Sequence, residues 1–327
     1  MKAPVALKQA RGARPCINAS SIEDGEETNM KIKGFVIAAT ALAFSYATVA
    51  AAADNSMAAV CGDCVIEKVA SCGGFLEGAT TDASGRVWAV DLSGDRILEI
   101  SDGRCISHGS AGGMPNGAKW RKDGTLLIAG SRGLLAFDPK ANSIKTIADT
   151  FEGTPLSGLN DIAIDEVGGV YMTQPNGSSA VNPIGRLFYL PPGASEPMLL
   201  AANIPFPNGV AIGPNGQTVI VSEFAIRRVL SMPSVTAKGG IQLVHVYVTP
   251  NSGVGADGML MDGKGRLFTA NIGAGEIECF SPEQRSLGVI RLPDEAGRLV
   301  TNMTIAGGYL YVTEASKGEI WRVRLAS

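Results

Sequence analysis

Histidine is scarce in this 327-residue chain, which contains only His108 and His245. His245 lies within an apolar, strand-like segment at residues 243–247, and neither histidine stands at the head of the repeated motif described below. A Gly-x-Ser-x-Gly segment, which marks the nucleophile elbow of many serine hydrolases, is also absent. We therefore expect neither histidine to be catalytic, and the sequence does not indicate a serine hydrolase.

The chain lacks long stretches with the 3.6-residue periodicity of amphipathic helices. Glycine is abundant instead, with 41 residues, and short runs of β-branched and aliphatic residues alternate with turn residues. This pattern favours an all-β protein with many turns. The length is sufficient for one large domain with a substantial core.

Basic charge is not in excess. The chain has 28 Lys and Arg against 31 Asp and Glu, and residues 1–53 hold six of the basic and four of the acidic residues. The remainder therefore carries 22 basic and 27 acidic side chains. Such a balance does not attract a phosphate backbone, so we exclude nucleic acid as a partner and expect a small-molecule substrate and a monomer.

The first 53 residues have the features of an export signal preceded by an extension. Met30-Lys31-Ile32-Lys33 is a short basic start, residues 34–47 form an apolar run, and Ala51-Ala52-Ala53 resembles a signal-peptidase site. We interpret residues 1–29 as a non-native extension caused by the choice of start codon. The prediction is an exported protein, periplasmic or secreted, without a membrane anchor after cleavage and with a single domain at 54–327.

Five cysteines follow the predicted cleavage site, which is an odd number: Cys61, Cys64, Cys72, Cys105 and Cys279. Export permits disulfides, and at least one thiol must then stay unpaired. The pair in Cys61-Gly62-Asp63-Cys64 has no strand–helix–strand pattern around it. We expect it to be an N-terminal staple and not a redox motif, and the sequence leaves the pairing open.

A hairpin motif is repeated six times along the chain. Residues 207–223 show it most clearly: a strand beginning with Pro207-Asn208-Gly209, a turn at Asn215-Gly216, and a second strand. A third strand and a weaker fourth follow in most copies. Four short strands in each of six repeats predict a six-bladed β-propeller. The polar residues that head the copies are Glu77, Asn116, Asn160, Asn208, Asp257 and Asn302.

The last repeat ends after three strands, which would leave an unpaired sheet edge. A strand-like segment at residues 64–69 precedes the first repeat. We predict that this N-terminal strand joins the last blade and closes the ring.

In a propeller, the innermost strands run along the central channel, so the six head residues should converge. Asn-Gly and Asp-Gly are also ordinary turn dipeptides, and the simpler interpretation of each head is a turn. Six carbonyl- or carboxylate-bearing side chains in register favour a different interpretation, a site for a hard cation. Oxygen ligands without Cys or His suit Ca²⁺ in the first place, with Mg²⁺, Mn²⁺ or Zn²⁺ as alternatives.

The order Glu77, Asn160-Asp161, Asn208-Gly209 and Asp257-Gly258 in a six-bladed frame resembles the gluconolactonase/regucalcin (senescence marker protein) family, to which diisopropylfluorophosphatase is related. The resemblance covers nearly the whole mature chain. It implies a metal-dependent hydrolase of a lactone or related ester. Glu77, Asn160, Asn208 and Asp257 are then the metal ligands, and Asp257 is also the candidate catalytic base. Asn116, Asn160 and Asn302 are the implied substrate-binding residues of the channel.

Two features depart from this resemblance. Sugar lactonases carry an Arg-Pro pair before the Asn-Asp, whereas this chain has Gly158-Leu159, which indicates a less polar substrate. Residues 222–228 are similar to strictosidine-synthase-like propellers, although Glu223 with Arg227 or Arg228 is better explained as a structural ion pair. A non-catalytic exported propeller that binds a ligand or serves as a scaffold is the other alternative, but it would not need two carboxylates in its channel.

Specificity should depend on loops that share a face with the heads. These are residues 151–155 and 174–183, together with Phe206, Phe224 and Ile272, and their composition predicts a partly apolar cup.

Overall fold

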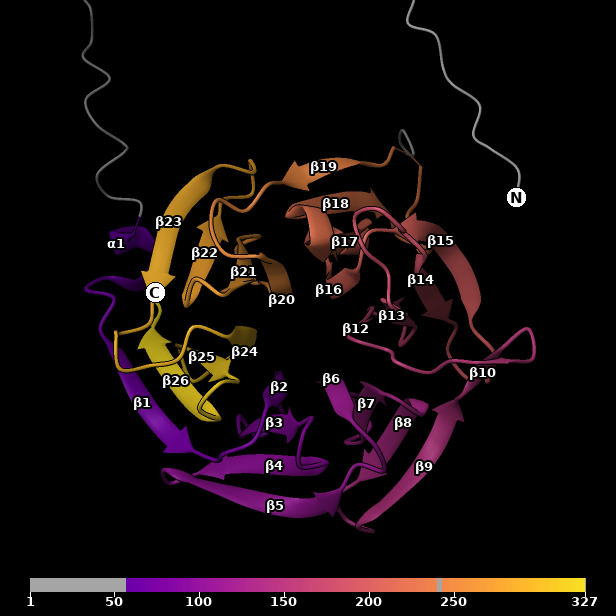
Figure 1. Ribbon diagram of the computed structural model, residues 1–327, viewed down its shortest axis with the longest axis horizontal. Helices are drawn as coiled ribbons and strands as arrows, with labels where there is room; N and C mark the ends of the chain where they lie inside the picture. The colour runs from indigo at the N-terminus through magenta and orange to yellow at the C-terminus, as the bar shows by residue number, and fades with distance from the viewer. Residues whose placement is uncertain (1–56, 240–242, 327) are drawn as a thin grey trace, which may run out of the picture. The chain divides into compact units, whose positions relative to one another are not determined.

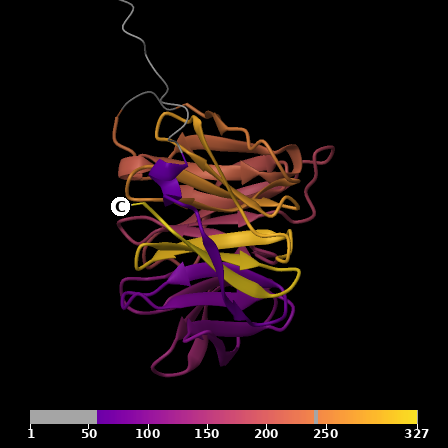
Figure 2. The same cartoon turned by 90° about the vertical axis from the view of Figure 1, so that its left-hand side faces the viewer.

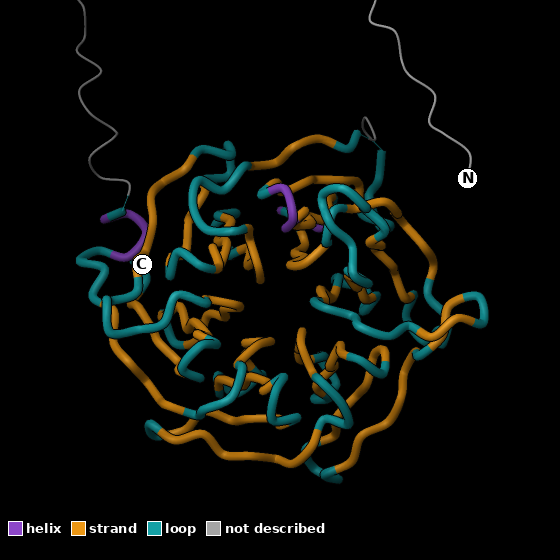
Figure 3. Tube along the Cα trace, viewed as in Figure 1, coloured by secondary structure: helices purple, strands orange, loops and turns teal. Residues whose placement is uncertain are grey.

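The computed structural model describes residues 57–239 and 243–326, and all of them belong to one compact unit. The predicted leader at 1–53 lies outside the described residues. Six four-stranded antiparallel sheets surround a central axis, which confirms the predicted six-bladed β-propeller (Figure 1). Loops join successive strands on both faces of the ring, and helical segments are few and short (Figure 3).

Within each blade the strands follow one another from the axis outward, as the repeat predicted. Blade 1 contains β2 (Leu76–Thr81), β3 (Val87–Asp91), β4 (Arg96–Ser101) and β5 (Arg104–Ser110). Blade 2 contains β6 (Pro115–Trp120), β7 (Leu126–Gly130), β8 (Gly133–Asp138) and β9 (Ser143–Ala148). Blade 3 contains β12 (Ile162–Ile164), β13 (Val170–Gln174), β14 (Gly185–Leu190) and β15 (Met198–Ile204).

The second half of the ring repeats this order. Blade 4 contains β16 (Pro207–Ile212), β17 (Thr218–Glu223), β18 (Arg228–Pro233) and β19 (His245–Val248). Blade 5 contains β20 (Gly255–Met261), β21 (Leu267–Ile272), β22 (Glu276–Phe280) and β23 (Ser286–Arg291). Blade 6 contains β24 (Val300–Ala306), β25 (Tyr309–Glu314), β26 (Glu319–Arg324) and β1 (Ile66–Ser71). The remaining elements are the hairpin β10 (Thr150–Phe151) and β11 (Thr154–Pro155), α1 (Ala58–Cys61), and the 3₁₀ helices η1 (Pro214–Gly216) and η2 (Phe224–Ile226).

Strand β1 closes the ring, as predicted. It pairs antiparallel with the C-terminal strand β26, from Ile66 opposite Val323 to Ser71 opposite Glu319. Figure 2 shows the indigo strand β1 running beside the yellow strands of the same blade. The N-terminal strand begins two residues later than predicted from the sequence. The otherwise open edge of β26 is thereby covered, which removes an unpaired sheet edge.

The cysteines reinforce this closure. One disulfide joins Cys72, directly after β1 of blade 6, to Cys105 in β5 of blade 1, so it connects the outer strands on either side of the seam. The other joins Cys61 to Cys64 next to α1, which agrees with an N-terminal staple. Cys279 is buried and unpaired, as the odd count required.

The hydrophobic core consists of six layers, one between each pair of neighbouring sheets. The layer between blades 1 and 2, for example, contains Trp88, Val90 and Ile97 from the first sheet and Leu126 and Ile128 from the second. The side chains of all five are almost fully buried. Burying one such side chain stabilises the fold by about 1.5–3 kcal/mol, so each sheet is held mainly by its neighbours. This packing fixes the blades around the channel and positions the head residues.

Candidate functional site

The inner strands share a β-bulge at their channel ends. Pairing with the second strand shifts register between Pro115 and Ala118, between Pro207 and Val210, and between Ala256 and Met259. The residues that the shift leaves out of the ladder are Asn116-Gly117, Asn208-Gly209 and Asp257-Gly258. A bulge can redirect a side chain, and such bulges are common beside active sites. The predicted heads therefore lie where regular pairing is interrupted.

The glycine after a head residue allows the next blade to approach. A Cβ atom on Gly209 would lie 2.2 Å from the carbonyl oxygen of Asp257, and one on Gly78 would lie 2.4 Å from that of Asn116. A Cβ on Gly117 would meet Asn160 O at 2.7 Å. These contacts are too short for any side chain. The glycines of the Asn-Gly pairs therefore serve close packing of the heads, and the alternative interpretation as hairpin-tip turns does not hold for them.

The genuine hairpin tips lie at the other ends of the inner strands. Asn215-Gly216 belongs to η1 between β16 and β17, and Asp123-Gly124 lies between β6 and β7. Both positions are exposed or half-buried and distant in the strand from the bulge. The sequence prediction that these two Gly turns occupy the opposite face is confirmed.

Asn302 does not occupy the head position of blade 6. Its pairing shifts between Val300 and Met303, so Thr301 is the residue that corresponds to Asn160. Asn302 Oδ1 accepts a hydrogen bond from Met303 N at 2.8 Å, as Asp161 Oδ1 does from Ile162 N at 2.9 Å. Asn302 is therefore the counterpart of Asp161. From the sequence, Asn302 was matched with Asn160 and not with Asp161, because the bulge is not visible in the strand pattern.

Polar side chains from several blades come together in the channel. The Asn302 side chain of blade 6 lies beside the Asp161 carboxyl of blade 3, and this carboxyl accepts a hydrogen bond from Val210 N of blade 4 at 3.1 Å. The Asn208 side chain of blade 4 lies beside the Asp257 carboxyl of blade 5. Glu77 of blade 1 interacts electrostatically with both of these carboxyls. Side chains from five blades thus converge at one place.

Two predicted metal ligands are buried carboxyls. Glu77 is 4% exposed and Asp257 is 5% exposed. Burial raises the pKa of Asp257 to about 8, with the nearby Asp161 raising it further and the Asn208 hydrogen bond opposing the shift. Burial also raises the pKa of Glu77 well above its usual range, and repulsion from Asp257 and Asp161 raises it further. Like charges held together without water resist ionisation, and a cation between them relieves that repulsion.

Asn208 offers an unused oxygen beside these carboxyls. Its side chain is 4% exposed, and its Oδ1 atom has no hydrogen-bond partner in the described part of the chain. The only comparable buried side-chain atom among those residues is Trp120 Nε1. A buried carbonyl oxygen without a partner costs about 1–3 kcal/mol, so native structures usually supply one. A metal ion would satisfy it.

The donor set fits a hard divalent cation. Within residues 57–239 and 243–326, no group of three or more His, Cys, Asp or Glu side chains has the arrangement of a metal site. Two carboxyls with amide oxygens would therefore have to hold the ion, as the sequence predicted from Glu77, Asn160, Asn208 and Asp257. Asn160 and Asn116 are half-buried. Oxygen-only donors favour Ca²⁺ or Mg²⁺ over softer ions.

Two charged residues at this site were not predicted from the sequence. Asp161 was noted only as part of the Asn160-Asp161 pair, yet its buried carboxyl links three blades. Lys119 was not singled out, although its ammonium group opposes the rise that burial causes in the pKa of both Glu77 and Asp161. One signal was present: Lys119 is the only charged residue located three positions after a head residue.

The predicted rim is partly apolar. Phe206 and Phe224 lie in ring contact with centroids 5.4 Å apart, and the hairpin β10–β11 overlaps the predicted segment 151–155. The segment after β13 is held by Ser178, whose hydroxyl donates to Ile204 O at 2.8 Å and accepts from Phe206 N at 3.1 Å. The rim segments are therefore fixed to the blades that carry the heads.

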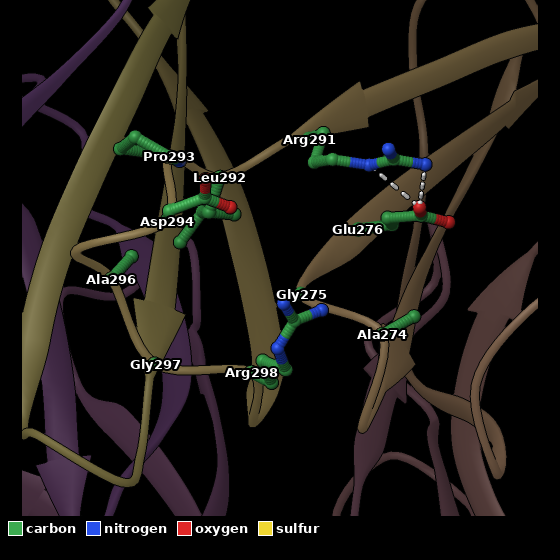
Figure 4. Close-up of a pocket in the computed structure, with 10 residues that line it drawn as sticks. All are labelled: Ala274, Gly275, Glu276, Arg291, Leu292, Pro293, Asp294, Ala296, Gly297 and Arg298. Atoms are coloured by element: carbon green, nitrogen blue, oxygen red, sulfur yellow. Dashed lines mark hydrogen bonds and ion pairs between the residues drawn. The ribbon is translucent and has the colours of Figure 1, made fainter.

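A polar pocket of about 270 Å³ lies at the seam between blades 5 and 6 (Figure 4). It is lined by the turn after β21 and the segment that enters β24, and an ion pair between Arg291 and Glu276 spans one side. Arg298 points into it (Figure 4). None of the predicted site residues lines this pocket.

Residues judged structural from the sequence have structural partners. His108 lies in the outer strand β5. Its Nε2 atom is 3.0 Å from Glu99 Oε2, and the centroid of its ring is 4.6 Å from that of Trp88. His245 is exposed at the start of β19. Glu223 forms an ion pair with Arg228, as predicted.

Comparisons with known proteins agree with this architecture. Residues 75–316 match the family described as SMP-30/Gluconolactonase/LRE-like region. Among curated proteins, the lactonase drp35 of Staphylococcus aureus (strain MW2) is 25% identical over 234 residues, which cover 67% of this chain and 70% of that protein.

Two solved structures have the same fold. A gluconolactonase from Xanthomonas campestris superposes with a TM-score of 0.72 at 20% identity, covering 83% of this chain and 93% of that one. A calcium-binding protein, regucalcin, from Agrobacterium tumefaciens str. C58 gives a TM-score of 0.65 at 20% identity, and the match covers 78% of this chain and 95% of that one.

Proposed function

Because the chain belongs to the SMP-30/gluconolactonase/LRE-like family, we propose that it is a metal-dependent hydrolase of a lactone or a related ester. The observation that supports this most directly is the cluster of two buried carboxyls, Glu77 and Asp257, beside the unpartnered oxygen of Asn208. A scaffold protein has no use for such a cluster, because buried like charges and an unpaired carbonyl destabilise the fold. The names of the lactonase drp35 and of the gluconolactonase neighbour support the same class of reaction.

Glu77, Asn160, Asn208 and Asp257 would hold a divalent cation, with Ca²⁺ as the first candidate. Bound there, the cation would polarise the ester carbonyl and favour the ionised forms of the surrounding carboxyls. The Asn208 side chain lies beside the Asp257 carboxyl and favours its ionised form. The packing of Gly209 against the backbone of Asp257 fixes the two residues relative to each other.

Asp257 is the proposed general base. Its carboxylate takes a proton from the attacking water as the water oxygen bonds to the carbonyl carbon. The bond from that carbon to the ring oxygen then breaks, and the proton is returned to the departing oxygen, which leaves as an alcohol. For a lactone the product is one hydroxy acid. His108 and His245 take no part, because both lie on outer strands.

The substrate we propose is less polar than a sugar lactone. The Gly158-Leu159 pair offers no guanidinium for hydroxyl groups, and Leu159 is 1% exposed, so it belongs to the core. The Phe206–Phe224 contact adds apolar surface at the rim. Asn116 and Asn160 remain half-buried polar groups that could orient a carbonyl or hydroxyl.

We also propose that the protein works outside the cytoplasm. Two disulfides among the described residues support an oxidising compartment, in keeping with the predicted leader. No helix in the described ranges is long and apolar enough to cross a membrane.

We further propose that the protein is a monomer. Gel filtration with light scattering tests this oligomeric state.

The test is hydrolysis of a panel of lactones and aryl esters by the purified protein, with and without a chelator. The proposal expects activity that the chelator removes and that Ca²⁺ or another divalent ion restores. Glu77→Gln and Asp257→Asn should each lower kcat by at least about 100-fold while the protein stays folded. Glu99→Gln, in the third strand of blade 1, is the matched control. Wild-type activity in the Glu77→Gln and Asp257→Asn variants would refute the assignment of these two residues as metal ligands.

A further inference from the structure

A cavity of about 540 Å³ lies at the end of the central channel opposite the heads. It is lined by the last residues of the six innermost strands and by Asp262-Gly263 at the tip between β20 and β21. None of the four proposed metal ligands lines it. Since a strand rises about 3.3 Å per residue, a residue three positions after a head lies roughly 10 Å further along the channel. The cavity is therefore separate from the site at the heads.

The wall of this cavity on blades 3, 4 and 5 is apolar. The strands β12, β16 and β20 end there at Ile164, Ile212 and Met261, and all three side chains are partly exposed. Trp120 of blade 2 and Ile305 of blade 6 extend the same kind of surface. Partly exposed apolar side chains that face one cavity favour an apolar occupant over water.

The remaining wall is polar and carries one uncompensated charge. Blades 1 and 6 contribute Thr81 and Thr304, whose hydroxyl oxygens are 2.8 Å apart. Blade 2 contributes Lys119, whose half-buried ammonium group makes no ion pair and no hydrogen bond with the described residues. The other ionised group of the lining, Asp262, is already paired with Arg266 at 2.7 Å. The cavity thus offers a single positive charge to a ligand.

We propose that this cavity binds a small monocarboxylate with an aliphatic body. The carboxylate would accept hydrogen bonds from the Lys119 ammonium group, and the aliphatic chain would lie against Ile212 and Met261. Blade 5 stands opposite blade 2 in the ring, so a ligand that meets both Lys119 and Met261 spans the channel (Figure 1).

The size and the charge of the cavity both support this class of ligand. Small-molecule sites usually have volumes of about 300–1,000 Å³ and apolar walls with a few polar groups, and this cavity has both features. One ammonium group matches the single charge of a carboxylate, whereas a phosphate ester would bring a second charge without a partner. The inference does not depend on the proposed hydrolase activity.

The experiment is calorimetric titration of the full chain with sodium octanoate, once with Ca²⁺ and once with a chelator. We expect one octanoate per chain and the same affinity under both conditions, because the ligand does not contact an ion at the heads. Acetate has the charge without the chain, and octan-1-ol has the chain without the charge. Each should bind at least about tenfold more weakly than octanoate.

Variants locate the carboxylate. Lys119→Met keeps the apolar stem and removes the charge, so octanoate should bind about tenfold more weakly while octan-1-ol binds as before. Lys119→Arg should retain octanoate binding. Lys122→Met is the matched control, because Lys122 is exposed beside the neighbouring hairpin tip and does not line the cavity.

A second variant keeps the test decisive if Lys119→Met does not fold. Gly263 lines the cavity, and a Cβ atom there has no other atom within 4 Å, so Gly263→Glu adds a negative charge at the rim without crowding. This charge should weaken the binding of octanoate but not that of octan-1-ol.

The outcomes separate this inference from the metal site. Selective loss of octanoate binding in Lys119→Met or in Gly263→Glu would support it. Wild-type protein that binds no octanoate, or Lys119→Met that binds octanoate as tightly as the wild type does, would overturn it. Binding that the chelator abolishes would place the carboxylate at the heads, which would also overturn the inference while leaving the proposed function intact.

Discussion

The side chain of Asn208 lies beside the carboxyl of Asp257 from the neighbouring blade, and its own Oδ1 is buried without a partner in the described part of the chain. That oxygen is therefore available for a cation. Two adjacent blades thereby present one carboxyl and one carbonyl oxygen side by side. Four predictions follow from this packing of the heads and from the closure of the ring.

The stability of the metal-free protein should depend on pH through Asp257. Its folded pKa, about 8, lies above the value of an unfolded aspartate, near 4. The folded state thus holds a proton that the unfolded state has released, and stability falls as pH rises from about 4 to 8, with a slope of up to about 1.4 kcal/mol per pH unit. Urea unfolding of metal-free protein at pH 5 and pH 8 measures the loss, which should be smaller in Asp257→Asn. If Asp257→Asn lost as much unfolding free energy between pH 5 and pH 8 as the wild type does, other groups would be responsible for the pH dependence.

Calcium should stabilise the wild type but not Asn208→Ala. A ligand at 100 times its Kd stabilises the folded state by about 2.7 kcal/mol, which is easily seen as a rise in Tm. Removal of the Asn208 oxygen takes away one ligand and also frees the Asp257 carboxyl. Thermal unfolding with and without Ca²⁺ checks this, with Asn215→Ala in the exposed turn of η1 as the control. A full Tm rise in Asn208→Ala would exclude this residue as a ligand.

Gly209→Ala should damage both folding and the site. The added Cβ would lie 2.2 Å from Asp257 O, so the heads of blades 4 and 5 must separate. Overpacking of this kind costs about 1–3 kcal/mol. Gly263→Ala is the matched control, because no atom lies within 4 Å of a Cβ placed there, and its effect should stay within about 0.5 kcal/mol. Equal unfolding free energies for the two variants would contradict the close approach of the blades.

Loss of the disulfide between Cys72 and Cys105 should weaken ring closure. The bond closes a loop with a sequence separation of 33, for which chain entropy predicts a stabilisation of about 3–4 kcal/mol. The Cys61–Cys64 disulfide spans a separation of only 3 and should contribute about 2 kcal/mol less. Urea unfolding of the paired serine variants, Cys72→Ser/Cys105→Ser and Cys61→Ser/Cys64→Ser, compares them. A larger loss in the second pair would show that α1, and not the blade seam, limits stability.

Local patterns in the sequence were enough to predict the blades and their closure. Alternating strands and Gly turns are short-range signals, and an incomplete last repeat requires a strand from elsewhere, which β1 supplies. The register of Asn302 was wrong by one residue, because the pattern of apolar and polar residues does not reveal the bulge in β24. Disulfide pairing could not be deduced, since Cys72 and Cys105 become neighbours only when the ring closes.

The charges of the site were only partly predictable. Glu77 and Asp257 stand at the heads, where the repeat makes them visible. The contribution of Asp161 depends on Val210 and Asn302 from two other blades, and that of Lys119 on the alignment of six strands around the axis. Such relationships arise from the closed ring, so no single repeat contains them.

Calorimetric titration of the metal-free protein with Ca²⁺ measures whether Glu77, Asn160, Asn208 and Asp257 hold a cation together. We expect one ion per chain in the wild type, and affinity at least about tenfold weaker in both Glu77→Gln and Asp257→Asn. Wild-type protein that binds no Ca²⁺, Mg²⁺, Mn²⁺ or Zn²⁺, or variants that bind Ca²⁺ as tightly as the wild type does, would contradict it.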